Sequence, residues 1–388
     1  MDVCFSFAAA GLYVLTVLWT LSRGHAAGHG APHWPRGGAL LWPLGGALLW
    51  PLGGASLCYV VSPALCGLVL LSCSVRLIWD KKTSELLLPE TRGVLITGCD
   101  SGFGHALAKR LSLMGVKVFA GVLDVGGAGA QRLRETSENL HVLQLDVRDT
   151  HQVETVHRDI CSQVGHTGLW GLVNNAGVLQ CPMDAELQPL AACRRCMDVN
   201  FLSAVHMCQV FLPLLRRAGG RIVNMSSMAA AVPMPMFSAY GASKAALSVF
   251  SHVMRAELSD WGVTVALIQP AGFRTNIFGT SDNVSRYRDE VLAAASPEAR
   301  RDYGDAYISS LPSGLSRLSQ RSAEDLSPVV DDMCHALLSV HPRPLYTPGQ
   351  MGWLLPFVHR HCPTAIFDVI IKTLTKDNDC EPTGLRTS

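Results

Sequence analysis

The 388-residue chain is 48% hydrophobic and 16% charged, a balance typical of a chain with a sizeable core. Its 32 Lys and Arg against 31 Asp and Glu give a formal net charge of +1. This balance provides no basic field, so we exclude nucleic acid as a partner. The 13 cysteines are scattered along the chain and are predicted to be reduced thiols. Cys193 and Cys196 form a C-x-x-C without a second pair, which predicts two thiols on a helix and no metal site.

Residues 1–82 differ in kind from the rest of the chain and are predicted to form a membrane anchor. Cys4 to Leu21 and Ser56 to Trp79 are apolar runs long enough to span a bilayer. A cleaved signal peptide is the alternative for the first run, but that run lacks a basic start. Between the runs, an octapeptide of the type WPxGGALL repeats from Trp34 to Leu57. Its prolines disfavour a helix in water, so the repeat is either a third span or a re-entrant hairpin.

Basic residues around these runs bear on the orientation of the anchor. Arg23 and Arg36 follow the first run, and Lys81 and Lys82 follow the last. Three spans place all four charges on the cytoplasmic side, whereas two spans place the first pair on the opposite side. We therefore favour three spans over two and a cytosolic domain over residues 83–388. A glycosylation sequon at Asn283 would be used only in a lumenal domain, whereas the sequon at Asn224 falls in a predicted buried strand.

From Arg92 onward, short apolar runs alternate with longer helical stretches. This alternation predicts an α/β fold with a doubly wound parallel sheet of the Rossmann type. The predicted strands are Val94 to Thr97, Val116 to Val122, Leu140 to Leu145, Gly171 to Val173, Arg221 to Asn224, Val263 to Gln269 and Leu345 to Thr347. Near the C-terminus, Trp353 to Leu374 is apolar and contains two prolines, which predicts a packed helix pair or, alternatively, an interfacial membrane contact.

The first predicted strand runs directly into a glycine-rich turn, TGCDSGFG, and then into a helix from Ala106 to Leu113. Glycines permit a tight turn and close approach of the backbone, and a helix N-terminus offers free N–H groups to a pyrophosphate. The candidate cofactor residues of this turn are Gly98, Ser101, Gly102, Phe103 and Gly104. Asp124 follows the second strand, where a carboxylate would bind the adenine ribose and repel a 2′-phosphate. This pattern favours NAD over NADP, although an ordinary turn aspartate is the alternative.

Four further residues form a candidate catalytic set. Tyr240 and Lys244 are four residues apart, so they share one face of a helix. A tyrosine with a pKa of about 10 is a poor base at neutral pH, and a nearby ammonium favours its phenolate. Ser227 follows the predicted strand ending at Asn224 and can hydrogen-bond the reacting oxygen, as Tyr240 can. Asn200 can hold a water through which the proton leaves.

Together, TGCDSGFG, the NNAG of residues 174–177, Asn200, Ser227 and Y-x-x-x-K resemble the short-chain dehydrogenase/reductase family from Arg92 to Thr347. The resemblance implies a single Rossmann-type domain, a nicotinamide dinucleotide cofactor and Tyr240 as general base of a catalytic tetrad. It also implies further cofactor contacts at Asn174, Ala176, Gly177, Tyr240, Lys244, Asp146 and Thr275. One departure is Pro270-Ala271-Gly272 where the family usually has Pro-Gly, which puts the backbone next to the nicotinamide in doubt.

Within the family, the anchor and the segments VFAGVLD, TNIFGTSD and YTPG are similar to the membrane-bound hydroxysteroid dehydrogenases. This similarity implies NAD-dependent oxidation of a steroid secondary alcohol in the endoplasmic reticulum membrane, with the 17-beta-hydroxyl of estradiol or testosterone favoured. An 11-beta-hydroxysteroid, a retinoid and, more remotely, a non-catalytic dinucleotide sensor are the alternatives. The residues from Val232 to Phe237 line an apolar pocket, or belong to the core or a membrane-facing surface. The family also implies a homodimer through the helices that carry Asn200 and Tyr240.

Overall fold

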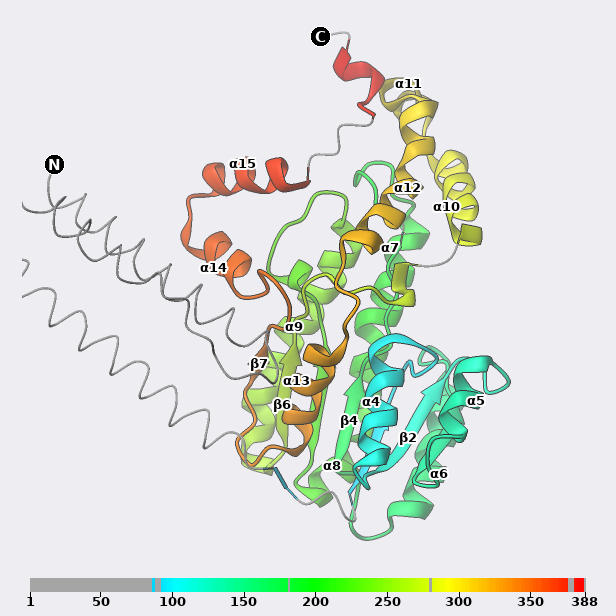
Figure 1. Ribbon diagram of the computed structural model, residues 1–388, viewed down its shortest axis with the longest axis vertical. Coiled ribbons are helices and arrows are strands. Elements are labelled where there is room, and N and C mark those ends of the chain that lie inside the picture. The colour runs from blue at the N-terminus through cyan, green and yellow to red at the C-terminus, as the bar shows by residue number, and fades with distance from the viewer. Residues whose placement is uncertain (1–85, 88–91, 181, 279–280, 376–379, 387–388) are drawn as a thin grey trace, which may run out of the picture. The chain divides into compact units, whose positions relative to one another are not determined.

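A computed structural model describes residues 86–87, 92–180, 182–278, 281–375 and 380–386 (Figure 1). The two predicted membrane runs and the octapeptide repeat lie outside these residues, as do the four basic residues that flank them. Within the described ranges, one helix is long and apolar enough to cross a membrane, Leu190–Ala218. The structure places this helix against the central sheet, where 44% of its most apolar stretch is buried, so it serves as a core helix.

The centre of the domain is a sheet of seven parallel strands in the order β3-β2-β1-β4-β5-β6-β7. Its strands are β1 (Gly93–Ile96), β2 (Lys117–Val122), β3 (Leu140–Gln144), β4 (Gly171–Asn174), β5 (Arg221–Met225), β6 (Thr264–Ile268) and β7 (Leu345–Tyr346). All seven predicted strands are confirmed, with small shifts at their ends. The reason is that strands covered on both faces are nearly continuous apolar runs, as in Val94, Leu95 and Ile96, which are fully buried.

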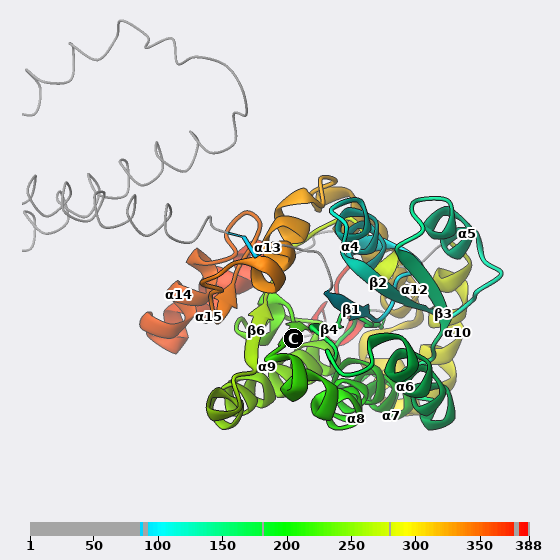
Figure 2. The ribbon, with the colours of Figure 1, turned by 90° about the horizontal axis from the view of Figure 1, so that it is seen from below.

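Helices cover both faces of this sheet, and each face has its own core (Figure 2). One face is covered by α4 (Gly102–Leu113), α5 (Ala128–Arg134) and α13 (Ser327–Leu338). The opposite face is covered by α6 (Thr150–Val164), α8 (Ser203–Ala218) and α9 (Ser238–Leu258). The predicted doubly wound fold is therefore confirmed. Because the strand order reverses between β1 and β4, a crevice is expected at the carboxyl ends of these two strands.

Helix α7 (Leu190–Met197) continues into α8 through a π turn, η2 (Asp198–Leu202). Cys193 and Cys196 lie on α7 as free thiols, as predicted for the C-x-x-C. The described residues contain no group of three or more His, Cys, Asp or Glu placed to hold a metal ion.

Two additions to the sheet complete the described fold. Between β6 and α13, the short helix η5 (Asn276–Phe278) is followed by α10 (Ser281–Ala294), α11 (Pro297–Tyr303) and α12 (Asp305–Arg321). These helices form a separate small core with Leu179, Met183 and Leu187. After β7 come α14 (Leu354–His361) and α15 (Thr364–Thr375), so the predicted C-terminal helix pair is confirmed. The remaining short helices are η3 (Met228–Ala230), η4 (Ser259–Trp261) and η6 (Thr383–Arg386).

Candidate active site

The glycine-rich turn after β1 is built so tightly that side chains are excluded at two of its positions. Gly98 has a φ of +69°, and a Cβ there would lie 2.9 Å from the Cα of Ala176. A Cβ at Gly104 would lie 2.5 Å from the carbonyl oxygen of Gly98. Ser101 is the N-cap of α4, and its side chain makes no capping hydrogen bond. The first turn of α4 therefore leaves N–H groups for a ligand, the arrangement that suits a pyrophosphate.

A threonine connects this turn to the segment after β4. The buried Thr97 hydroxyl accepts hydrogen bonds from the backbone N–H groups of Asn175 and Ala176, both at 3.0 Å. In return, the side-chain amide of Asn175 donates to the carbonyl oxygens of Thr97 and Gly98 at 2.9 and 3.1 Å. The two loops at the switch point of the sheet are thus held together by four hydrogen bonds.

Of the adjacent asparagines, Asn175 lines the cavity at this edge of the sheet, whereas Asn174 is buried away from it. The Asn174 amide donates to the Oδ1 atom of Asn224 on β5 at 2.8 Å and to the Cys208 sulfur on α8 at 3.4 Å. The side chain predicted to contact the cofactor thus faces the core, because successive residues of a strand point to opposite sides. The structure places the neighbouring Asn175 in that position instead.

The acidic residues at the ends of β2 and β3 differ in their surroundings. The Asp100 carboxylate accepts from the backbone N–H groups of Leu123 and Asp124, which holds the end of β2 against the glycine-rich turn. Asp124 is exposed, and its own carboxylate accepts from the N–H of Gly126 at 2.9 Å. Asp146 lines the cavity, and the hydrogen-bonded Arg148 guanidinium lowers the pKa of its carboxyl. The two aspartates predicted to contact the cofactor, Asp124 and Asp146, therefore follow the ends of β2 and β3.

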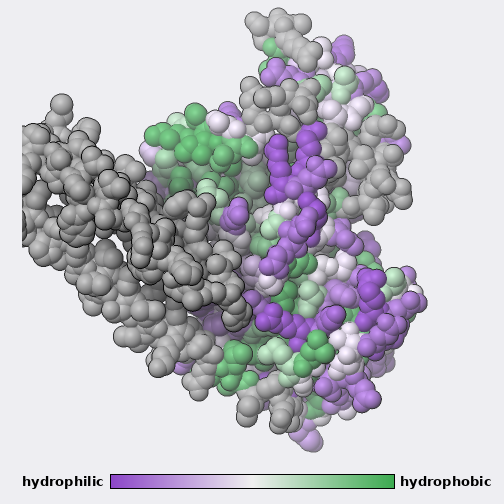
Figure 3. Space-filling model, in the orientation of Figure 1, coloured by the Kyte–Doolittle hydropathy of each residue, from purple (hydrophilic) through white to green (hydrophobic). Residues whose placement is uncertain are grey.

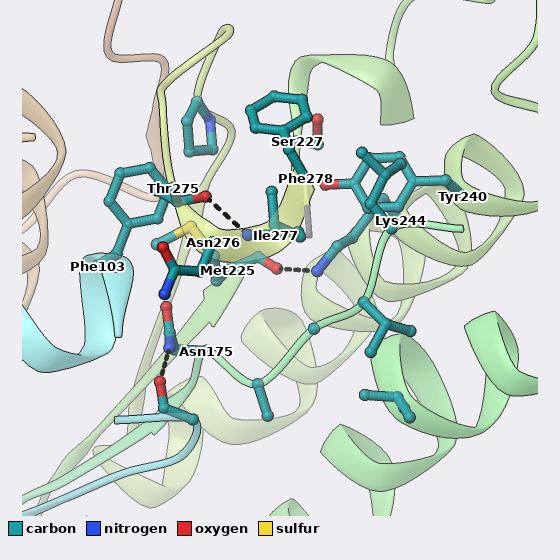
Figure 4. A pocket seen from close by; sticks show the side chains of 18 of the residues that line it. Phe103, Asn175, Met225, Ser227, Tyr240, Lys244, Thr275, Asn276, Ile277 and Phe278 are labelled. Atoms are coloured by element: carbon teal, nitrogen blue, oxygen red, sulfur yellow. Dashed lines mark hydrogen bonds between the residues drawn. The ribbon is translucent and has the colours of Figure 1, made fainter. Parts of the chain in front are cut away.

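The four predicted catalytic residues come together from α9, η2 and the end of β5. Ser227 and Tyr240 both line the cavity, and Ser227 lies close enough to Tyr240 to lower the pKa of its hydroxyl. The Lys244 ammonium donates to the Met225 carbonyl oxygen at 2.8 Å and lies 5.9 Å from the centre of the Tyr240 ring. Figure 4 shows Ser227, Tyr240 and Lys244 on one side of the cavity, with Phe103 and Asn175 on the other.

Asn200 is almost fully buried behind this group. Its Oδ1 accepts from the Val178 N–H at 2.8 Å, and its amide nitrogen donates to the Val178 carbonyl oxygen at 3.0 Å. A Cβ at Gly177 would lie 3.3 Å from the Lys244 Nζ and 3.4 Å from the Asn200 Oδ1. A side chain at position 177 would therefore press on Lys244 and Asn200, and these two side chains would have to shift by a few tenths of an ångström.

Burial controls the protonation of the tyrosine and lysine. It raises the pKa of Tyr240 to about 12, although the hydrogen bond from Ser227 acts in the opposite direction. It also lowers the pKa of Lys244 to about 8, because removal from water disfavours the charged form of either group. The i, i+4 placement is as predicted, but the predicted stabilisation of the phenolate by Lys244 does not outweigh burial in this geometry.

Ser243 is a functional candidate that the sequence did not reveal. It is fully buried on α9, where its hydroxyl donates to the Tyr240 carbonyl oxygen at 2.7 Å and accepts from the Asn200 amide at 2.9 Å. It thereby joins the helix that carries Tyr240 to the π turn that carries Asn200. A serine between two motif positions is too common to be noticed in a sequence, because its partner lies 43 residues away.

All of these elements surround one cavity of about 530 Å³, within the range usual for small-molecule sites. Its dinucleotide end is lined by the glycine-rich turn, by Asp146 and by Thr275, whose Cβ lies 3.4 Å from the Cβ position of Gly102. The opposite, apolar end is lined by Val178, Leu179, Met228, Met234, Phe237, Ile277 and Phe278. Part of the Val232 to Phe237 segment therefore lines the cavity, while Val232 itself is buried in a core cluster.

The departure at Ala271 does not disturb the wall of the cavity. Ala271 lines it, and its backbone N–H donates to the carbonyl oxygen of Pro348 at 3.0 Å. The flanking Pro270 and Gly272 carbonyl oxygens accept from Met228 and Ala323. Three hydrogen bonds thus fix the backbone whose position the extra alanine had put in doubt.

The parallel sheet, the glycine-rich phosphate cradle and the tyrosine–lysine pair define a dinucleotide-dependent oxidoreductase. The residues fit the cofactor, because the first turn of α4 leaves N–H groups for a pyrophosphate and the glycine-rich turn lines the same cavity as Tyr240 and Lys244. The chain belongs to the short chain dehydrogenase family, whose sequence profile matches residues 92–284.

Relatives in this family share much of the chain. Mouse estradiol 17-beta-dehydrogenase 2 is 44% identical over 311 residues, which cover 79% of this chain and 82% of the mouse protein. Human 11-beta-hydroxysteroid dehydrogenase type 2 is 41% identical over 277 residues, or 71% of this chain and 68% of that protein. Human retinol dehydrogenase 16 is 36% identical over 294 residues, which cover 76% of this chain and 92% of that protein.

Solved structures support the same fold. A short chain dehydrogenase/reductase from Burkholderia phymatum in complex with NAD has a TM-score of 0.59 at 22% identity and covers 72% of this chain and 96% of its own. A short-chain dehydrogenase from Streptomyces avermitilis has a TM-score of 0.56 at 23% identity, and the match covers 73% of this chain and 97% of that one. At this level of identity the likeness concerns the fold alone.

Proposed function

We propose that this protein oxidises a steroid secondary alcohol to a ketone with NAD, and that the 17-beta-hydroxyl of estradiol or testosterone is the reacting group. The observation that carries the proposal is that Ser227 and Tyr240 line one cavity together with the glycine-rich turn and with apolar side chains such as Met234 and Phe237. A rigid apolar alcohol placed in that cavity presents its hydroxyl to both side chains. The mouse relative named as an estradiol 17-beta-dehydrogenase supports this choice of substrate.

The protein's part in the reaction is to orient the alcohol and to move its proton. Ser227 holds the alcohol oxygen, and Tyr240 takes the hydroxyl proton as general base. A bound oxidised nicotinamide would supply the hydride acceptor, and its positive charge would favour the phenolate form of Tyr240. Lys244 holds the nicotinamide ribose and adds a second positive charge, while Asn200 positions a water beside Lys244 for release of the proton. Most of the acceleration comes from positioning and preorganised charge.

Further residues would bind the remainder of the cofactor. Gly98, Ser101, Gly102, Phe103 and Gly104 hold the pyrophosphate, and Ala176, Gly177 and Thr275 border the nicotinamide. Asp146 contacts the adenine, and Asp124 binds the ribose hydroxyls. The exposed position of Asp124 at the end of β2 supports the choice of NAD, because its carboxylate would repel the 2′-phosphate of NADP.

We also propose that residues 1–82 anchor the protein in the endoplasmic reticulum membrane, that residues 83–388 form the catalytic domain on the cytosolic side, and that two copies pair through α8 and α9. Two exposed apolar side chains on α9, Val249 and Val253, support the pairing. Attachment of a glycan at Asn283 in microsomes would contradict the cytosolic placement. The sequon at Asn224 is fully buried and cannot serve as a control.

The test measures NADH formation by membranes that contain the full chain. Estradiol, testosterone, cortisol and retinol are each supplied with NAD or NADP, and Tyr240→Phe is assayed beside the natural protein. Turnover of 17-beta-hydroxysteroids with NAD, lost in Tyr240→Phe, supports the proposal. Turnover of cortisol or retinol alone replaces the substrate and keeps the mechanism, whereas full activity in Tyr240→Phe refutes the mechanism. Binding of NAD without turnover of any alcohol would indicate a dinucleotide sensor.

A further inference from the structure

The helix pair α14–α15 leaves a large apolar surface uncovered. Its exposed side chains are Trp353, Phe357, Ile366, Val369 and Leu374, each between 53% and 65% accessible. Figure 3 shows a hydrophobic area in the upper left of the view, where Figure 1 places α15. We call these five side chains the outer face. A contiguous apolar surface of this kind usually marks a contact with a protein or a membrane.

The opposite side of the helix pair is firmly packed, so the outer face is not a product of loose folding. Leu355, Phe367 and Ile371 are buried against Val232. Val369 lies on another side of α15 from Phe367 and Ile371, as its high exposure shows. The helix pair therefore has two apolar sides, of which only one is used within the domain.

The packed side leads directly to the substrate end of the cavity. Met228 and Met234 pack against the same cluster as Phe367 and Ile371, and both methionines also line the cavity. A single layer of flexible side chains thus lies between the helix pair and the apolar end of the cavity. Methionine side chains adapt readily to a passing ligand.

The attachment of the anchor indicates what covers the outer face. Leu86 and Leu87 pair with Ser339 and Leu338, which lie just ahead of the edge strand β7, and α14 follows that strand. Only six residues separate Leu86 from Trp79, where the last apolar run ends, and the seven steps between them reach about 25 Å at most. If that run spans a bilayer, the β7 edge of the domain stays close to the membrane surface.

The chemistry of the helix pair also suits a bilayer. From Trp353 to Thr375 the sequence contains one acidic residue, Asp368, against Arg360, Lys372 and two histidines. Exposed aromatic and aliphatic side chains with basic residues at their margin are typical of helices that lie in a membrane interface.

We propose that the outer face of α14 and α15 lies in the interfacial layer of the bilayer, and that apolar substrate passes from the lipid to the cavity past Met228 and Met234. The docking rests on the proposed anchor, and the entry route rests on the proposed apolar substrate. The two parts have separate tests.

Docking is tested in proteoliposomes of the full chain, with a fluorescent amino acid placed at Val369 or at Leu190. These positions are matched, because they are 65% and 64% exposed, and Leu190 lies on α7 in the other helix layer. With lipids brominated in the acyl chains, we expect quenching at 369 to exceed quenching at 190 at least about threefold. Equal quenching at both positions, or none at 369, would overturn the docking. So would energy transfer between copies at 369 without lipid quenching, because a second copy would then cover the face. Retention of the protein in alkali-washed membranes tests the anchor separately.

The entry route is tested with Ile366→Asp/Val369→Asp and the matched control Leu190→Asp. None of these positions lines the cavity. In vesicles, the double variant is expected to raise KM for a membrane-partitioned steroid about fivefold or more, with kcat and KM for NAD unchanged. An unchanged KM for the steroid refutes the route, and so does an equal rise for a water-soluble alcohol substrate. Lipid quenching requires no turnover, so failure of the proposed activity leaves the docking result readable.

Discussion

Replacing Thr97 by valine tests whether the glycine-rich turn and the segment after β4 act as one unit. The Thr97 side chain is 1% exposed, and its hydroxyl accepts from two backbone N–H groups, those of Asn175 and Ala176. Valine keeps the shape of threonine but removes the acceptor. The substitution therefore perturbs hydrogen bonding with little change in packing volume.

The expected loss of stability follows from counting the remaining partners. The Asn175 N–H retains the Val173 carbonyl oxygen at 3.1 Å. The Ala176 N–H has only the Thr97 hydroxyl among the hydrogen bonds found in the described residues. A buried donor left without a partner costs about 1–3 kcal/mol. Because Ala176 is only partly buried, we expect about 1–2 kcal/mol, the lower part of that range.

The assay compares Thr97→Val and Thr97→Ser by denaturant unfolding in detergent and by KM for NAD. Serine keeps the acceptor and loses one buried methyl group, which costs about 0.8 kcal/mol. We therefore expect both variants to lose stability but only valine to raise KM for NAD, because only valine frees the segment that carries Asn175. An equal rise of KM in both variants, or a valine variant as stable as the natural protein with an unchanged KM, would refute this reasoning.

Three further predictions concern catalysis and the cofactor. Ser243→Ala removes the hydrogen bonds that join Ser243 to Tyr240 and Asn200. It should lower kcat about tenfold, which corresponds to about 1.4 kcal/mol, with KM unchanged, because Ser243 positions these two residues without touching substrate. Lost stability with unchanged kcat would leave Ser243 a structural role only. Asp124→Ser should raise the ratio of kcat/KM with NADP to kcat/KM with NAD about tenfold or more, since the repelling carboxylate is gone. Asp124→Glu is its control, and an unchanged ratio in the serine variant would contradict the assignment. For alcohol oxidation, kcat/KM should rise from about pH 6 to about pH 7.5, a range in which Lys244, with a pKa of about 8, keeps most of its charge, because the base is the phenolate and burial raises the pKa of Tyr240 to about 12. Initial rates at constant ionic strength test this, and a rate that falls with rising pH would count against Tyr240 as the base.

The sheet was predictable because its pattern is local. Val94, Leu95 and Ile96 form an unbroken apolar run, and the glycines that follow have a use only in a tight turn. The relative position of Tyr240 and Lys244 was likewise predictable from their spacing, since residues four apart lie on one face of a helix. These features depend on neighbours in the chain, which a sequence displays directly.

Other parts of the site depend on tertiary contacts that a sequence does not display. Two adjacent asparagines are chemically identical, so only the structure shows that Asn174 bonds to Asn224 while Asn175 faces the cavity. The importance of Ser243 likewise depends on a partner in η2. The helices α10 to α12 carry no motif, although they form the core beside the substrate end. Burial also depends on the complete fold, and it is burial that raises the pKa of Tyr240.

The opposite pKa shifts of Tyr240 and Lys244 have one origin and a joint consequence. Burial disfavours charge on either group, so it raises one pKa to about 12 and lowers the other to about 8. At neutral pH, Lys244 therefore keeps most of its charge, whereas Tyr240 keeps its proton. A protonated tyrosine beside Ser227 is a ready acid for ketone reduction and becomes a base only when further positive charge enters the site. An oxidised nicotinamide, bound as proposed, would supply such a charge, so on this proposal Tyr240 would act as a base for the alcohol and as an acid for the ketone.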